Sequence, residues 1–132
     1  MFTKIHNLVM AVKNAEEAAK LYTDNFGLEV SRTGTLPGQG LKVAFLAIGD
    51  ATIEFIEPLN PQEGPVAKFL QSHGEGLYMV ELEVESIDQA IQSLTEKGVR
   101  LLGADPESRA KDGLVFIHPR SAKGLLIALM QK

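Results

Sequence analysis

The order of secondary-structure signals in this chain occurs twice, and this duplication restricts the possible folds more than any other feature of the sequence. In each half, an apolar and β-branched run is followed by a helical pattern and then by three more strand-like runs. The leading strands are predicted over 4–12 and 77–84, and the helices follow Asn14 and Ser86, which suit helix N-caps. The sequence therefore predicts two β-α-β-β-β modules.

Turn-forming residues separate the remaining elements of the two modules. The first module is predicted to contain strands over 28–33, 41–48 and 51–57, and the second over 99–102, 114–118 and 125–130. A short helix over 65–72 joins the modules, loops are predicted over 60–64 and 103–112, and Gly113 supplies a break. The stretch 34–40 is rich in glycine and is predicted to form a mobile lid or hairpin.

A single β-α-β-β-β module covers only one face of its sheet. Two modules can place their helices outside and curve their strands around a shared cavity. We therefore predict the α+β class, with two βαβββ modules forming a cupped mixed β-sheet around a central cavity. The 132 residues suit one such domain, with module 1 at about 3–59, the linker helix at about 64–72 and module 2 at about 75–131.

Strand periodicity predicts which side chains face this cavity, because successive residues of a strand point to opposite faces. Met10 and Val12 belong to an all-aliphatic set that suits packing under a helix, so the alternate set of that strand is predicted to face inward. The same alternation in the matching strands completes four inward positions, which are Asn7, Glu54, Met79 and Ala128.

Composition and charge exclude several classes of protein. The formal net charge is −4 and no basic run occurs, so nucleic acid is not an expected partner. No apolar stretch reaches the roughly 20 residues of a membrane span, and the first residues lack a signal-peptide pattern, so we expect no membrane partner and a cytoplasmic location. Cysteine is absent, and His6, His73 and His118 are the only histidines available for metal binding or acid–base chemistry.

Several segments, taken in order, resemble the vicinal oxygen chelate superfamily, and within it most closely the methylmalonyl-CoA epimerase family. They are AVKNAEEAAKLYTDNFGLEV, VAFLAIGDATIEFIEPL, GPVAKFL, GEGLYMVELEV, EKGVRLL and FIHPRSAKGLLIAL. The resemblance runs from about Lys4 to Met130. It implies a small-molecule ligand or substrate and a homodimer.

The resemblance also implies a divalent metal held by His, Glu or Gln, His and Glu at the four inward positions. Of the residues here, only Glu54 fits, because Asn7, Met79 and Ala128 stand at the other three. The family's proposed second base, before a Gln-Gly pair, is replaced by Gly38. We therefore predict no metal. The alternative is a weakly held divalent ion at Glu54 with His6, if a bulge turns His6 inward.

Glu54 and Glu81 are the predicted catalytic residues. A carboxylate in an apolar cavity has its charged form disfavoured by desolvation, so the pKa of Glu54 is expected to rise and the group to shuttle protons. Glu81 has the same predicted facing, and the two carboxylates could share a proton. Structural alternatives are a hydrogen bond from Asn7 to Glu54 and a solvated position for Glu81.

The predicted substrate-binding residues share an inward facing or a place in the glycine-rich hairpin. They are Asn7, Gln39, Phe45, Met79, Phe116, His118 and Ala128. Asn7 could orient a carbonyl or enolate oxygen, because an amide both donates and accepts hydrogen bonds. His118 shares the strand parity of Phe116, although the resemblance assigns the His-Pro pair a structural role.

Three functions fit these observations. The first is a metal-independent enzyme that acts on a small acyl or carbonyl compound, such as a CoA thioester, by proton transfer in an isomerisation, epimerisation or lyase step. The second is a non-catalytic protein that binds and sequesters a small hydrophobic molecule, as bleomycin-resistance proteins do. The third is a metal-dependent epimerase or lyase with an altered site.

Overall fold

The structure is a computed structural model that describes residues 1–111 and 114–132. In the described ranges the elements are β1 (Phe2–Ala11), α1 (Ala15–Phe26), β2 (Glu29–Leu36), η1 (Pro37–Gln39), β3 (Leu41–Ile48), β4 (Ala51–Pro58), α2 (Gly64–His73), β5 (Gly76–Val84), α3 (Ile87–Glu96), β6 (Leu101–Leu102), α4 (Pro106–Lys111), β7 (Val115–Ile117), η2 (Pro119–Ser121) and β8 (Ile127–Gln131). They divide into two units, which we call the Glu54 unit (7–78) and the Glu81 unit (1–6 and 79–132).

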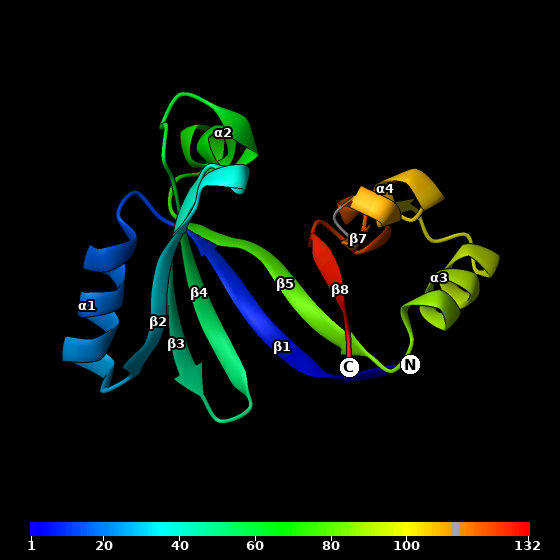
Figure 1. The fold of residues 1–132 in the computed structure, drawn as a ribbon, viewed down its shortest axis with the longest axis horizontal. Coiled ribbons are helices and arrows are strands. Elements are labelled where there is room, and N and C mark those ends of the chain that lie inside the picture. The colour runs from blue at the N-terminus through cyan, green and yellow to red at the C-terminus, as the bar shows by residue number, and fades with distance from the viewer. Residues whose placement is uncertain (112–113) are drawn as a thin grey trace. The chain divides into compact units, whose positions relative to one another are not determined.

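In the Glu54 unit the strands follow the order β2-β3-β4-β1. β1 pairs with β4 in parallel, whereas β3 pairs with β2 and β4 in antiparallel. Helix α1 lies along one side of these strands (Figure 1). It packs on a core of small and aromatic side chains, which are Val12, Ala15, Ala19, Ala44, Leu46 and Phe55, with Met10 and Ile53 beside them.

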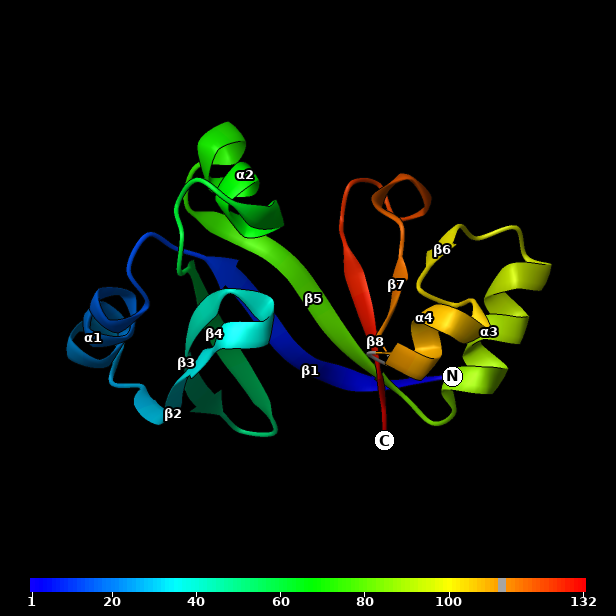
Figure 2. The same ribbon diagram turned by 45° about the horizontal axis from the view of Figure 1, so that its top comes forward.

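In the Glu81 unit the strands follow the order β5-β8-β7-β6, again with one parallel pair, β5 with β8. β8 pairs with β7, and β7 with β6, in antiparallel. Helix α3 lies beside β6 (Figure 2) and packs on a core of Val84, Ile87, Ala90, Leu94, Val115, Ile117 and Leu129. Parallel and antiparallel pairing in both units confirms the predicted mixed α+β class, while the enclosure of a cavity stays a prediction.

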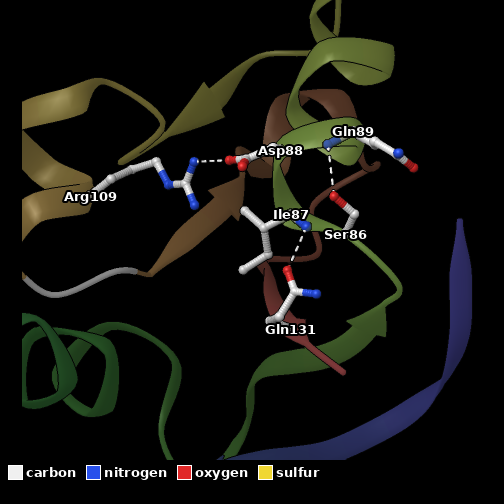
Figure 3. Close-up of polar contacts among 6 residues, drawn as sticks. All are labelled: Ser86, Ile87, Asp88, Gln89, Arg109 and Gln131. Atoms are coloured by element: carbon white, nitrogen blue, oxygen red, sulfur yellow. Dashed lines mark hydrogen bonds and ion pairs between the residues drawn. The ribbon is translucent and has the colours of Figure 1, made fainter.

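Both leading helices begin with the same arrangement of hydrogen bonds. Asn14 and Ser86 are N-caps, as predicted, and accept from the backbone N–H groups three residues later at 3.0 and 3.2 Å. In α1, the first helical N–H also donates to Glu57 Oε1 of β4 at 2.8 Å. In α3, Ile87 N donates to Gln131 Oε1 of β8 at 2.8 Å (Figure 3). The last strand of each unit therefore supplies an acceptor to its first long helix.

The loop predicted over 103–112 is wrong, because it contains helix α4. Asp105 accepts from Ser108 N at 3.0 Å, Pro106 occupies the first helical position, and Arg109 pairs with Asp88 of α3 (Figure 3). Asp112 and the break predicted at Gly113 lie outside the described residues.

The predicted strand over 99–102 is shorter than expected. Val99 N donates to Leu94 O of the preceding helix, so only Leu101–Leu102 pairs with β7. The predicted strand over 28–33 is longer and extends to Leu36, and the 34–40 stretch joins β2 to β3 as a hairpin closed by η1. No helix in the described part of the chain is long and apolar enough to cross a membrane.

Candidate active site

The candidate site lies on the sheet face of the Glu54 unit that is opposite α1. Met10 and Phe55 pack against the α1 side, so Val9 and Glu54 point to the other face, as strand parity predicted. The register places four residues in one row across the sheet, in the order Arg32, Phe45, Glu54 and Val9. Glu54 therefore has an aromatic side chain on one neighbouring strand and an aliphatic one on the other.

Glu54 accepts a hydrogen bond from Asn7. Asn7 lies on β1, two residues before Val9, which is the direct cross-strand partner of Glu54. Asn7 Nδ2 donates to Glu54 Oε1 at 2.7 Å, and Thr52 Oγ1 donates to Asn7 Oδ1 at 2.7 Å. Asn7 is 2% exposed and Glu54 is 9% exposed, so this chain of hydrogen bonds is nearly enclosed by protein. The hydrogen bond that the sequence offered as the structural alternative for Glu54 is confirmed, and it fixes the orientation of the carboxylate, while the catalytic role of Glu54 stays a prediction.

A β-bulge in the edge strand determines where Arg32 points. Val30 pairs with Leu46 and Arg32 pairs with Phe45, so Ser31 is the extra residue. Ser31 Oγ donates to Phe45 O at 3.2 Å, and the Arg32 guanidinium carbon lies 4.2 Å from the centre of the Phe45 ring. This cation–π contact places a positive charge over the residue next to Glu54.

The corresponding face of the Glu81 unit is different. Glu81 pairs with Ala128, and Ala128 pairs with Phe116, so these three residues form one row. Ala128 is fully buried, whereas Glu81, Met79 and Phe116 are partly buried. Glu81 is thus partly shielded from solvent, and both its catalytic role and the solvated alternative stay predictions.

His118 lies at the turn between β7 and β8. Its Nδ1 accepts from Arg120 N at 3.0 Å and caps η2, while its own backbone N–H donates to Arg100 O at 2.9 Å. Desolvation, followed by the positive charges of Arg100 and Arg120, lowers the pKa of His118. These contacts favour a structural role, and a role in substrate binding stays a prediction.

Gln39, His6 and His73 belong to neither of these two rows. Gln39 is exposed in η1. His6 belongs to the Glu81 unit, and its Nδ1 is buried without a hydrogen-bond partner in the described part of the chain. His73 is the last residue of α2 and stacks on Phe69 with ring centres 4.6 Å apart.

A groove of about 400 Å³ lies on the α1 side of the Glu54 unit, away from these residues. Met10 and Phe55 form part of its wall together with Tyr22, and Lys13, Glu17 and Glu75 supply its charged groups. None of the candidate residues predicted from the sequence lines it. The groove is therefore separate from the candidate active site.

The side chains at the four predicted ligand positions do not fit a divalent metal ion. The Asn7 oxygen already accepts from Thr52, and its nitrogen, which is no metal ligand, faces Glu54. Met79 offers a soft thioether and Ala128 offers no donor atom. Within 1–111 and 114–132, no three His, Cys, Asp or Glu side chains are grouped to hold a metal.

The fold and this face together define a class of protein. The family model of the glyoxalase/bleomycin resistance protein/dioxygenase superfamily matches residues 6–116, and the chain belongs to that superfamily. The resemblance found in the sequence is thereby confirmed.

Among the relatives are methylmalonyl-CoA epimerases. The chain is 31% identical to the mitochondrial methylmalonyl-CoA epimerase of Homo sapiens over 97% of this chain and 73% of that protein. It is 31% identical to the ethylmalonyl-CoA/methylmalonyl-CoA epimerase of Cereibacter sphaeroides, over 99% of each chain. A solved variant of the Streptomyces coelicolor methylmalonyl-CoA epimerase, in complex with 2-nitronate-propionyl-CoA, matches with a TM-score of 0.86 and 26% identity, covering 100% of this chain and 96% of that one.

Sequence reasoning did not identify Thr52 or Arg32. Thr52 could have been found, because it shares the inward parity of Glu54 and is polar. Arg32 could not, because strict alternation places it on the α1 side and only the bulge turns it to the Glu54 face.

Proposed function

We propose that this chain epimerises an acyl-CoA thioester by proton transfer at the carbon next to the thioester carbonyl, without a divalent metal. The observation that carries the proposal is the enclosed Glu54 carboxylate, oriented by Asn7, in a chain that matches methylmalonyl-CoA epimerases over nearly its whole length. The predicted homodimer and cytoplasmic location stay predictions.

In this mechanism Glu54 takes the proton from the carbon that lies next to the thioester carbonyl. The electron pair of the broken C–H bond moves into the carbonyl, and return of a proton to the opposite face of the carbon gives the epimer. No atom is gained or lost and nothing is oxidised. Asn7 is a positioning residue, because it holds one oxygen of Glu54 at 2.7 Å.

The surroundings of Glu54 suit this role. Val9 and Ile56 are 1% and 3% exposed on the same face, and Phe45 covers the adjoining strand position. Such apolar neighbours exclude water and strengthen the electrostatic interactions of a carboxylate with a bound substrate. A catalytic role for Glu81 stays a prediction, and the variant Glu81→Gln tests it.

The test is exchange of the reacting proton. One enantiomer of methylmalonyl-CoA is incubated with the protein in D₂O, and loss of the C2 proton signal is followed by NMR while optical activity follows epimerisation. The wild type is expected to catalyse both, and Glu54→Gln is expected to lower the rate by about 10²–10⁴-fold. Glu81→Gln, measured in the same way, tests the second carboxylate.

Glu57→Gln is a matched control for Glu54→Gln. Glu57 lies on the same strand but on the α1 side, where it accepts from Ala15 N, and a glutamine accepts equally well at the corresponding Gln131. Its rate should therefore stay near that of the wild type. Equal loss in both variants would contradict a specific role for Glu54.

The metal part of the proposal has a separate test. Elemental analysis of the purified protein should detect no stoichiometric metal, and subsequent titration with a chelator should leave the exchange rate unchanged. Loss of activity that is restored by a divalent ion would contradict the metal-independent mechanism and would favour the altered metal site.

A second candidate function is sequestration of a small molecule without turnover. It is favoured by the side chains Met79 and Ala128, which offer neither an acid nor a base where the superfamily's ligands are expected. Binding of the thioester without any deuterium exchange, in both wild type and Glu54→Gln, would support this candidate.

A further inference from the structure

We propose that Arg32 is the residue that selects an acyl group carrying a carboxylate, by binding that carboxylate on the Glu54 face. This inference rests on the proposed function and names its substrate class: a thioester whose reacting carbon also bears an anionic group. Nothing in the sequence pattern alone points to Arg32.

The first argument is the β-bulge at Ser31. Val30 pairs with Leu46, so without the extra residue Ser31 would pair with Phe45 and Arg32 would pair with Ala44. Ala44 is fully buried in the core beneath α1, so Arg32 would then belong to the α1 side. Bulges often re-aim a side chain next to a functional site. Here the bulge brings a cation to the face that carries Glu54.

The second argument is the position of the charge once it is re-aimed. The guanidinium lies over Phe45, whose direct cross-strand partner is Glu54. Neighbouring strands are about 4.8 Å apart, so the backbones of Arg32 on β2 and Glu54 on β4, two strands apart, are separated by about 10 Å. A carbon that gives its proton to Glu54 and carries a carboxylate directed toward β2 fits within that separation.

The third argument is the chemistry that remains available to Arg32. Arg32 is exposed and, within 1–111 and 114–132, it has no ion pair with any acidic side chain. A cation–π contact needs no oxygen acceptor, so the five N–H donors of the guanidinium can still bind an anion. A planar fork of donors binds a carboxylate through two parallel hydrogen bonds, which favours a carboxylate ligand.

Lys42 provides a matched control on the same sheet. It lies on β3, one strand from Arg32, and it carries the same charge. However, it points to the α1 side, where its Nζ lies 3.2 Å from Glu16 Oε1. Removal of its charge changes the net charge of the protein as much as removal of Arg32 does, without altering the Glu54 face.

The experiment measures dissociation constants by calorimetry for methylmalonyl-CoA, propionyl-CoA and CoA. We expect Arg32→Gln to weaken methylmalonyl-CoA binding by about 10–100-fold and to leave propionyl-CoA and CoA within about twofold of the wild type. Arg32→Lys should recover only part of the loss, because lysine lacks the planar fork. Lys42→Gln should bind all three ligands as the wild type does.

Other results would overturn the inference. Equal weakening of all three ligands would assign Arg32 to a phosphate of CoA rather than to the acyl carboxylate, and no weakening would show that Arg32 binds neither. Failure of the wild type to prefer methylmalonyl-CoA over propionyl-CoA would also overturn it. Because calorimetry reports binding whether or not epimerisation occurs, selective weakening together with absent epimerisation would leave the inference standing and reject the proposed function.

Discussion

The two units are built on the same plan, but the faces opposite their leading helices carry different chemistry. In the Glu54 unit the row across the sheet is Arg32, Phe45, Glu54 and Val9. In the Glu81 unit the corresponding row is Leu102, Phe116, Ala128 and Glu81. Only the aromatic position is retained, and the charges occupy different strands.

This difference shows which parts of a duplicated module are fixed by folding and which are free to change. The side chains beneath α1 and α3 and the acceptors at the helix starts serve the same purpose in both units. The opposite faces do not contribute to the cores beneath α1 and α3. Polar residues on these faces can therefore be replaced without loss of either core. Asn7 and Met79 illustrate this freedom, because they hold matching positions and share no chemistry.

The largest expected difference between the units concerns the matching positions Asn7 and Met79. Asn7→Ala removes one hydrogen bond from each of Glu54 and Thr52 in an enclosed place, which should cost about 1–3 kcal/mol of unfolding free energy. Met79→Leu conserves volume and should cost less than about 1.5 kcal/mol. Urea denaturation measures both. Equal losses of unfolding free energy in the two variants would mean that the hydrogen bonds of Asn7 do not distinguish the two faces.

A smaller and similar effect is expected at the two helix starts. Glu57→Ala and Gln131→Ala each remove the acceptor of the first helical N–H, and each should cost about 1 kcal/mol. Similar losses of unfolding free energy would support a shared stabilising role for the last strands. If one variant had the unfolding free energy of the wild type, the first N–H group of that helix would have another acceptor. The two helix starts would then share their geometry but not its contribution to stability.

The smallest effect is a pH dependence assigned to the turn of the Glu81 unit. The pKa of His118 is lowered in the folded chain, so the unfolded chain binds more protons between that lowered value and the ordinary histidine pKa of about 6.5. The contribution to stability is therefore complete above that ordinary pKa and is lost as the pH falls through the window below it.

Denaturation midpoints of the wild type and His118→Asn, compared at pH 5 and pH 8, measure this contribution. Asparagine can still accept from Arg120 N, and His6 and His73 are present in both proteins. The variant should lose less stability on acidification than the wild type does. The same loss in both would assign the pH dependence to other groups.

The sequence was sufficient for those features that depend on periodicity. The alternation along β1 correctly separated Val12, under α1, from Asn7, and the cap residues Asn14 and Ser86 were found from their spacing. Asp105-Pro106 is also a helix-start signal, but the six residues of α4 are too few to show a helical periodicity that would separate it from a loop.

The features that could not be predicted from the sequence depend on irregularities that interrupt the alternation of a strand. One extra residue at Ser31 reverses the facing of every residue after it on β2, and no local signal in that segment marks the position. The inward facing of Glu54 and its hydrogen bond to Asn7 were predictable from parity, whereas the offset of Asn7 from Val9, the direct cross-strand partner of Glu54, required the actual register of β1 and β4.

The helix starts also bear on the order in which the chain acquires structure during synthesis. The acceptors at Glu57 and Gln131 follow the helices that they complete by 42 and 44 positions, respectively. The first N–H group of each helix can therefore donate to this acceptor only after most of the unit has been synthesised. Each unit is thus expected to gain its final stability late and in one cooperative step, because non-local contacts form after the intervening chain is ordered.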